Sequence, residues 1–204
     1  MEKSFVEPHN KAVFTAGIRY GTETVRKLME TQYGTFHMGR KLGQMVIGLV
    51  LICVGAWLGT KVGVAALALG CIVVMSLNLR PRMQADEICR QYNGSFPNLR
   101  YSFTHTGFRT QQIPEEVSWG SVARLIDDGV YLYIFDRHET GYMVDRSTVK
   151  GSGGADALKA MLVRKTGLEW KKPSSVFKLR FRDLRDALSG SDGYSGERLD
   201  DRRR

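Results

Sequence analysis

Apolar positions are concentrated in one block of the chain, from Leu42 to Leu79, and Lys61 is the only Lys, Arg, Asp or Glu within it. One helix of this length would run about 57 Å, nearly twice a hydrocarbon core of about 30 Å. Two helices, over about 42–59 and 62–79, each come close to the minimum spanning length, with Gly-Thr-Lys between them as a turn. The pattern therefore predicts a two-helix transmembrane hairpin with Lys61 in the interface at its turn.

Two other interpretations of the block are weaker. A lysine at the middle of one long span would need an acidic partner, and the block contains no Asp or Glu. The core of a soluble domain would need enough chain to cover two apolar helices on every side, and the remainder of the 204 residues is too small for that. Small residues at helical spacing predict close packing within the hairpin; they are Gly48, Gly55, Ala66 and Gly70.

The charges lie on both sides of the apolar block and give a formal net charge of +9. Cations flank both predicted helices, whereas the turn holds Lys61 alone, so the positive-inside rule places both termini in the cytoplasm and the turn outside. Anionic lipid is the partner that fits these cations. The residues expected at the membrane surface are Arg40, Lys41, Arg80 and Arg82. Within "LRPR" at 79–82, the proline is expected to stop the second helix near that surface.

A short strand and a helix are predicted before the hairpin. Alternation over Ala12–Ile18 favours a strand, and the stretch from Thr22 to Glu30 favours a helix with Thr22 as its N-cap. A strand on its own is not stable. We therefore expect 12–18 to join a sheet formed later in the chain, so that the hairpin is an insertion into that domain.

The chain after the hairpin predicts a linking helix around 83–92, followed by short alternating runs rich in aromatic and β-branched residues. Turn signals separate these runs at Thr106-Gly107, at Asp128-Gly129 and in "DRHETG" at 136–141. Close-set strands with no helices between them favour an antiparallel meander. A helix within 155–167, ending at Gly167, follows. This is the outline of a pleckstrin-homology-like (PH-like) half-barrel closed by one helix.

A family resemblance covers roughly residues 95–170. A two-span hairpin followed by "YSFTHTGFRTQQIPEEVSWGSVARLIDDGVYLYIFDRHETGYMVDRSTV" resembles the YcxB-like family of bacterial membrane proteins. The resemblance implies a bacterial inner-membrane protein with a PH-like cytoplasmic domain. It implies no activity and carries over no catalytic residues.

The region beyond the predicted domain contains a second amphipathic pattern. Its apolar positions, 177, 181, 184 and 188, follow helical spacing, and its cations are Lys178, Arg180, Arg182 and Arg185. This basic segment, 169–188, fits either an anionic membrane surface or a helix docked on the PH-like domain. The polar residues 189–204 have no apolar periodicity and are expected to be disordered.

Residues that could carry chemistry are scattered along the sequence. The three cysteines form no CxxC, the four histidines form no metal-binding motif, and "GSGG" at 151–154 lacks the lysine of a P-loop. The sequence therefore predicts no enzyme, no metal and no cofactor. Its cations gather at the membrane flanks and in the tail instead of forming a stripe interleaved with aromatics, which argues against nucleic acid as a partner.

The predicted fold class is thus a membrane α+β protein, with a transmembrane hairpin and a cytoplasmic PH-like half-barrel capped by a helix. Its segments are 1–41, the hairpin 42–79, the linking helix and turn 80–98, the PH-like domain 99–168, the basic segment 169–188 and the tail 189–204. The predicted function is display of a binding module for a protein, peptide or lipid head group at the inner membrane. The alternative is a structural or accessory subunit of a membrane complex, assembled with a protein partner or a second copy through the hairpin.

Overall fold

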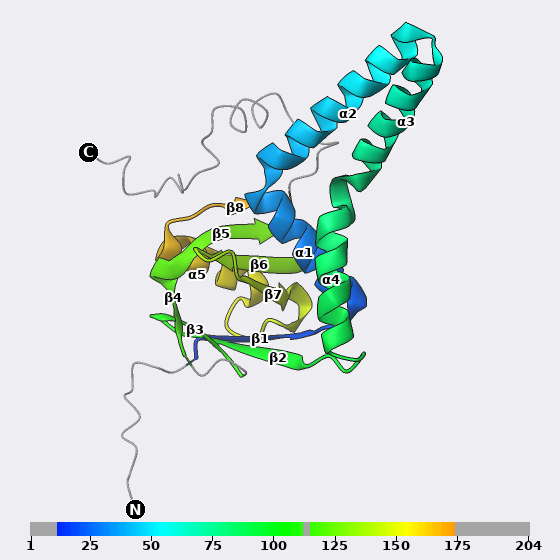
Figure 1. Ribbon diagram of the computed structural model, residues 1–204. Coiled ribbons are helices and arrows are strands. Elements are labelled where there is room, and N and C mark those ends of the chain that lie inside the picture. The colour runs from blue at the N-terminus through cyan, green and yellow to red at the C-terminus, as the bar shows by residue number, and fades with distance from the viewer. Residues whose placement is uncertain (1–11, 112–114, 174–204) are drawn as a thin grey trace, which may run out of the picture. The chain divides into compact units, whose positions relative to one another are not determined.

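The computed structural model describes residues 12–111 and 115–173, which form two compact units (Figure 1). Residues 21–94 form one of them, called the helical unit here. The other, called the sheet unit, combines residues 12–20 with the described residues from 95 to 173. The sheet unit is therefore built from both sides of the helical unit in sequence.

The helical unit consists of four α-helices and one 3-10 turn. They are α1 (Thr22–Phe36), α2 (Met38–Leu58), α3 (Lys61–Met75), η2 (Ser76–Asn78) and α4 (Leu79–Gln91). Two helical stretches, Met38–Leu58 and Lys61–Gln91, are long and apolar enough to cross a membrane by length and composition. The first therefore begins four residues before the predicted boundary at 42, and the second continues well beyond 79.

The turn between the two long helices contains the expected turn chemistry. Gly59 adopts the left-handed conformation, φ 57°, at the C-terminus of α2, which glycine tolerates without a Cβ clash. The Thr60 hydroxyl caps α3 by accepting a hydrogen bond from the Gly63 N–H at 3.3 Å. Lys61 is the first residue of α3 and is exposed, so the structure places it at the turn between two helices.

Pro81 does not stop the second helix, contrary to the prediction. The α-helical ladder is interrupted earlier by the 3-10 turn η2, and α4 then begins at Leu79 with Pro81 in its first turn. Proline is tolerated there because the N–H groups of a first turn have no intrahelical acceptor. The helical direction therefore continues from the apolar hairpin into the charged helix α4.

Helices α1 and α4 pack as an antiparallel pair. Val25 and Leu28 of α1 and Ala85 of α4 are buried, and Ala85 is fully inaccessible to solvent. The N-cap of α1 is Gly21, not Thr22 as predicted, and the Thr24 hydroxyl accepts a hydrogen bond from the Gly21 N–H at 2.7 Å. The helix is also longer than the predicted stretch to Glu30, since it ends at Phe36.

The sheet unit contains two four-stranded sheets and one α-helix. The first sheet has the order β1 (Phe14–Arg19), β2 (Asn98–Phe103), β3 (Gly107–Thr110) and β4 (Val117–Ser118). The second has the order β7 (Gly141–Asp145), β6 (Tyr131–Asp136), β5 (Val122–Asp127) and β8 (Trp170–Lys171). The 3-10 turns η3 (Trp119–Ser121) and η4 (Arg146–Thr148) and the helix α5 (Gly154–Thr166) complete the unit.

Strand β1 joins the first sheet across the inserted helical unit. It pairs antiparallel with β2 over six residues, from Phe14 opposite Phe103 to Arg19 opposite Asn98. A further bridge joins Thr15 to Lys150, which follows β7. The strand predicted from the alternation at 12–18 is therefore present, and it pairs with a strand that comes after the apolar block.

The core of the sheet unit is aromatic. Phe103 and Phe108 are fully buried, and their rings lie 6.4 Å and 5.6 Å from the ring of Trp119, measured between centroids. Tyr142 meets Phe108 edge to face at 4.8 Å. Such pairs add to the burial of large apolar rings. The predicted mixed α+β class with antiparallel sheets is confirmed, with one addition: β8 pairs parallel to β5.

That addition corrects the predicted boundary at 169. Trp170 and Lys171 form a strand of the sheet unit, so the basic segment does not begin directly after α5. The remaining part of that segment and the tail, residues 174–204, lie outside the described residues, together with Lys178, Arg180, Arg182 and Arg185.

Candidate functional site

Helices α2 and α3 pack through a seam of four glycines, which we call the glycine seam: Gly48, Gly55, Gly63 and Gly70. A Cβ atom added at Gly70 would lie 2.8 Å from the carbonyl oxygen of Gly48. One added at Gly55 would lie 2.6 Å from the carbonyl oxygen of Gly63. Real Cβ atoms do not approach oxygen so closely, so the backbones can meet only where no side chain is present.

The register of the seam explains which small residues belong to it. From one contact to the next, α2 advances seven residues, from 48 to 55, while α3 retreats seven, from 70 to 63. Seven-residue steps are typical of helices that keep one face together along a shallow crossing. Three predicted packing residues, Gly48, Gly55 and Gly70, are in the seam. The fourth, Ala66, is partly buried, and the seam also includes Gly63, which faces Gly55.

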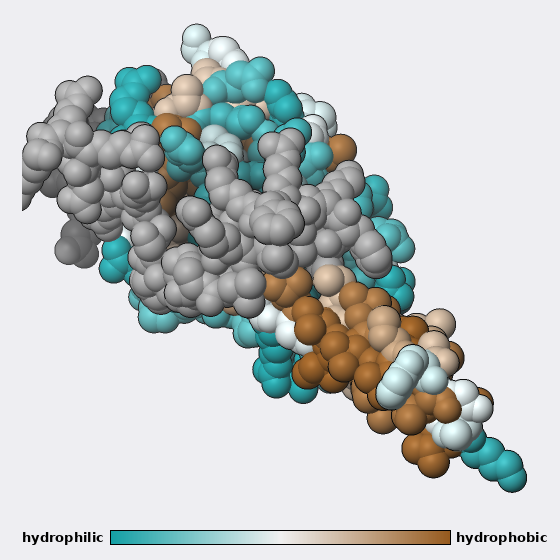
Figure 2. All heavy atoms as spheres, turned by 90° about the horizontal axis from the view of Figure 1, so that it is seen from above, coloured by the Kyte–Doolittle hydropathy of each residue, from teal (hydrophilic) through white to brown (hydrophobic). Residues whose placement is uncertain are grey.

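The outer surface of the same hairpin is aliphatic and exposed. Only 22% of the apolar window in α2, and 17% of that in the helical stretch from Lys61, is buried within the structure. In Figure 2 the hairpin is the hydrophobic, brown part of the surface. Large exposed side chains on it are Val46, Ile47, Leu49, Val50, Val54, Trp57, Leu58, Val62, Val64, Leu67, Leu69, Ile72 and Met75. A continuous apolar surface of this kind indicates contact with lipid or with another protein.

A polar group lies where the hairpin meets α1, and we call it the polar collar: Tyr33, His37, Lys41 and Asn78. The Lys41 side chain is 6% exposed, and its Nζ donates to Asn78 Oδ1 at 3.1 Å. Nζ also lies 5.3 Å from the centre of the Tyr33 ring, which stacks on His37 at 4.9 Å with an interplanar angle of 1°. Hydrogen bonding and the ring face offset part of the cost of burying the ammonium group.

The polar collar changes the interpretation of Lys41. The sequence predicts an exposed lipid contact, but the structure buries this side chain and gives it partners on α1 and η2. The residue next to it, Arg40, is exposed, as is Arg80 near the start of α4. Arg40 and Arg80, like the predicted contact Arg82, are therefore accessible to solvent.

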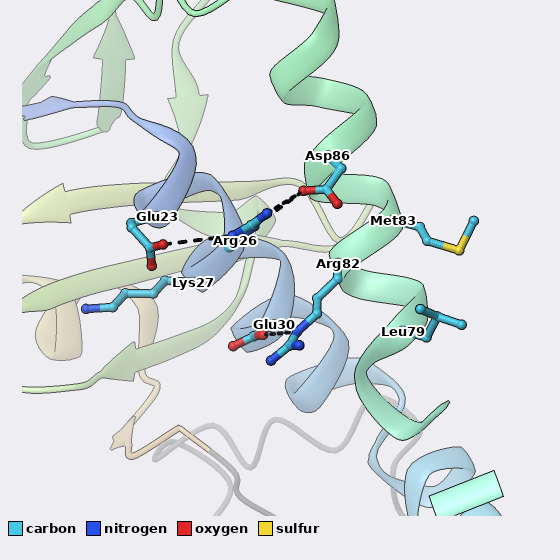
Figure 3. Close-up of a pocket in the computed structure, with 8 residues that line it drawn as sticks. All are labelled: Glu23, Arg26, Lys27, Glu30, Leu79, Arg82, Met83 and Asp86. Carbon is cyan, nitrogen blue, oxygen red and sulfur yellow. Dashed lines mark hydrogen bonds and ion pairs between the residues drawn. The ribbon is translucent and has the colours of Figure 1, made fainter. Parts of the chain in front are cut away.

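A shallow groove of about 570 Å³ runs between α1 and α4 (Figure 3). Charged side chains join its two sides: Arg26 Nη2 lies 2.9 Å from Asp86 Oδ1, and Arg82 Nε lies 3.5 Å from Glu30 Oε1. The hydrogen bond and the charge of Asp86 raise the pKa of Arg26. These exposed pairs contribute little stability, but they fix which faces of α1 and α4 meet. Arg82, a predicted lipid contact, is thus engaged within the helical unit.

Two carboxylates clamp the sheet unit. Glu116 accepts hydrogen bonds from the Thr104 and Thr106 hydroxyls and pairs with Arg109 at 2.9 Å, so it holds the β2–β3 turn. The hydrogen bond from Thr106, with that from Thr104 and the Arg109 guanidinium, lowers the pKa of Glu116 although burial opposes the shift.

The second clamp joins strand to helix, since Asp127 at the end of β5 forms an ion pair with Lys159 of α5. Burial alone would raise the pKa of Asp127, but hydrogen bonds from Lys159 and the Gly129 N–H, together with the Lys159 charge, lower it. Both oxygens of each carboxylate thus have partners within the sheet unit. Across residues 12–111 and 115–173, no three His, Cys, Asp or Glu side chains converge on a possible metal position.

Comparison of the chain with family models, with curated proteins and with solved structures found no match. What the structure defines is the class: a mixed α+β protein in which two apolar helices are inserted between the first and second strands of an antiparallel sheet.

Three functional features were missed by the sequence reasoning. Gly63 had a signal, because Gly63 and Gly70 repeat the seven-residue spacing of Gly48 and Gly55. The buried state of Lys41 had none in the linear pattern, since it depends on Tyr33 of the preceding helix α1 and on Asn78, which is distant in sequence. Strand β8 is two residues long, too short for a period-two pattern to register.

Proposed function

We propose that this chain is a bacterial inner-membrane protein. In this proposal the α2–α3 hairpin crosses the bilayer twice, and the sheet unit is displayed in the cytoplasm as a PH-like binding module. The observation that carries the membrane assignment is the contrast within the hairpin: its glycines are used for internal packing, while its large aliphatic side chains face outward. In water this surface would be costly, at about 1.5–3 kcal/mol for each large apolar side chain that is left unburied.

Charge supports the assignment and its orientation. The exposed cations Arg40 and Arg80 lie at the same end of the hairpin, next to its apolar part, and Lys61 lies at the other end. Cations at this boundary interact with anionic head groups, each contributing about 1 kcal/mol near the surface. With more cations at the open end than at the turn, both termini belong on the cytoplasmic side.

The binding-module part of the proposal rests on the sheet unit. Two four-stranded sheets, with the helix α5 following β7 and η4 in the chain, support the comparison with a PH-like half-barrel. The two carboxylates described there hold parts of the fold together: Glu116 at the β2–β3 turn and Asp127 between β5 and α5. A protein, a peptide or a lipid head group is the class of ligand that such a module would take.

Membrane extraction tests the proposal. After expression in bacteria, the intact chain should stay with the membrane pellet through an alkaline carbonate wash and should need detergent for release. A variant with Val50→Glu and Leu69→Glu places charges on the exposed aliphatic faces and should lose this behaviour, since a charge near the bilayer centre costs about 2.5–3.5 kcal/mol. Met83→Glu, at an exposed position outside the hairpin, is the matched control. Release of the unaltered chain by carbonate would contradict the proposal.

The alternative function is a subunit of a membrane complex assembled through the hairpin. The glycines face each other within one chain, so a partner subunit would have to bind the aliphatic outer surface of the hairpin. Native mass measurement in nanodiscs separates the two. A single copy favours the displayed binding module, and a defined oligomer that Leu69→Ala dissociates favours the subunit.

A further inference from the structure

The polar collar contains a buried cation without a counter-charge. Lys41 is 6% exposed, and its Nζ donates to the uncharged side-chain oxygen of Asn78 at 3.1 Å. Among residues 12–111 and 115–173, no carboxylate lies within 4 Å of this ammonium group. Glu30 of α1 pairs with Arg82 instead, at 3.5 Å. Buried charges in proteins are normally paired, so the Lys41 ammonium indicates an anion that comes from outside the chain.

The collar also contains two buried polar atoms that have no hydrogen-bond partner within the described part of the chain. They are the Tyr33 hydroxyl oxygen and His37 Nδ1. Tyr33 is 8% exposed, and the centre of its ring lies 5.3 Å from the Lys41 Nζ. Buried polar groups without a partner are rare, and a bound ion or water is a common explanation for them. The hydroxyl and the ammonium group are thus close together, and both have hydrogen bonds left to donate.

The start of helix α2 adds to the positive charge of the collar. The helix begins after His37 and has neither a side-chain cap nor an acidic residue in its first turn. Its first turn contains two cations instead, Arg40 and Lys41. The N–H groups and the positive end of the dipole at a helix start favour anions. The unpaired ammonium, the unpartnered hydroxyl and the helix start therefore favour the same class of ligand.

The position of the collar in the hairpin indicates which anion it meets. Lys41 directly precedes the apolar block, which starts at Leu42, and Asn78 lies at the other end of the block, next to Leu79. In the proposed topology this is the boundary between the hydrocarbon core and the cytoplasmic head groups, where the lipid phosphates lie. Asn78 is exposed, so the collar can be reached from this layer.

We propose that the polar collar binds the phosphate group of one phospholipid in the cytoplasmic leaflet. Lys41 supplies the charge, and the Asn78 amide N–H₂ and the Tyr33 hydroxyl donate hydrogen bonds to the phosphate oxygens. The acyl chains then lie on the exposed aliphatic surface of the hairpin. This inference rests on the proposed membrane-spanning function and adds a defined lipid site to the helical unit. The bound lipid neutralises the buried ammonium group and so stabilises the junction of α1 with the hairpin.

Lipid titration of the intact protein in detergent, followed by native mass spectrometry, tests the proposal. The probe is phosphatidylglycerol, and the affinity measured is that of the first lipid bound. Lys41→Met keeps the length of the side chain and removes its charge, so it should weaken this affinity by about tenfold or more. Arg40→Gln is the matched control: it removes the neighbouring exposed cation, whose charge is screened by solvent, and should weaken the affinity by less than about threefold.

Equal weakening by Lys41→Met and Arg40→Gln would overturn the proposal, because it would show a diffuse attraction between charges and no defined site. Tyr33→Phe covers the case in which Lys41→Met does not fold. It removes a hydroxyl that has no protein partner, so the fold should be retained while the affinity for phosphatidylglycerol falls by about threefold or more. Unchanged affinity in Tyr33→Phe would also overturn the proposal.

Competition identifies the molecule that carries the phosphate. Millimolar inorganic phosphate should leave the bound phosphatidylglycerol in place, because free phosphate has no acyl chains to contact the aliphatic surface. Displacement of the lipid would assign the collar to free phosphate and would overturn the proposal. Carbonate extraction of the same chains reports separately on membrane insertion. A chain that stays in the membrane pellet but binds no phospholipid at the collar would contradict this inference and leave the proposed function intact.

Discussion

At the scale of single residues, glycine decides how the two apolar helices meet. Gly48, Gly55, Gly63 and Gly70 let backbone contact backbone, and the side chains that would otherwise stand between the helices are turned outward. Elsewhere in a helix glycine is a cost, because it gives the unfolded chain more freedom. Replacing a glycine of α2 by alanine should therefore lower the stability of the protein if the glycine lies in the seam and raise it if the glycine lies outside.

Gly55→Ala and Gly43→Ala test this contrast. A Cβ at Gly55 would lie 2.6 Å from backbone atoms of Gly63 and Leu67, so the helices must separate, and we expect a loss of about 1–3 kcal/mol. Gly43 has nothing within 4 Å of its Cβ position, so alanine there should stabilise by about 0.5–1 kcal/mol. Thermal unfolding in mild detergent measures both. If the glycine seam did not limit packing, Gly55→Ala and Gly43→Ala would shift the stability of the protein in the same direction.

The Asp127–Lys159 ion pair gives a prediction about pH. The pKa of Asp127 is lowered in the folded protein, so its stabilisation is complete above the ordinary value of 3.8 and is lost as pH falls below it. At pH 7, Asp127→Asn should lower the free energy of unfolding of the sheet unit by about 1–3 kcal/mol, because a charged hydrogen bond is removed. Urea unfolding between pH 7 and pH 3 should show this difference shrinking as the pH approaches 3. A difference that stays constant over that range would contradict the assignment.

At the scale of elements, the important feature is that β1 belongs to the sheet although the helical unit separates it from β2. The main chain of Val13 and Thr15 bonds to Phe103 and to Lys150, so β1 connects the first sheet to the end of β7. Insertion of α1–α4 between two paired strands ties both ends of the helical unit to one sheet.

Phe14→Ala tests whether β1 is an integral part of the sheet unit. Phe14 is 6% exposed, and truncation of a buried phenylalanine costs about 3–5 kcal/mol. Val13, its neighbour, is 36% exposed, so Val13→Ala should cost less than about 1 kcal/mol. Chemical unfolding monitored by near-ultraviolet circular dichroism of the aromatic core makes the comparison. If Phe14→Ala and Val13→Ala lowered the free energy of unfolding by the same small amount, the sheet would not depend on β1.

Much of the fold could be predicted from the sequence because its signals are local. The helix break at Gly59-Thr60, the strand at 14–19 and the helix end at Gly167 each follow from residues that lie next to one another. The errors have long-range causes. Gly63 was missed because the register between α2 and α3 decides which small residues face the partner helix, and Lys41 is buried because Tyr33 and Asn78 come to it from other elements.

The prediction that Pro81 ends the second helix was wrong for another reason. Its effect depends on the phase of the helix, and the 3-10 turn at 76–78 places it in a first turn, where proline is compatible with helix. The sequence around it could predict an interruption but not the resumption of the helix at Leu79.

At the scale of the whole molecule, the two units have different tasks in the proposed function. The helical unit carries an exposed aliphatic hairpin with cations at its open end, and the sheet unit carries two four-stranded sheets and the helix α5. The first assignment predicts where the chain resides, and the second predicts what it binds there. Each can fail without the other.

The central claim, that the hairpin crosses the membrane twice with both termini inside, is tested most directly by cysteine labelling. In a chain with Cys53, Cys71 and Cys89 replaced by alanine, Lys61→Cys marks the turn and Glu87→Cys marks the exposed face of α4. A membrane-impermeant maleimide should label Lys61→Cys in intact spheroplasts and Glu87→Cys only after lysis. Labelling of Glu87→Cys in intact spheroplasts, or protection of Lys61→Cys until lysis, would contradict the account.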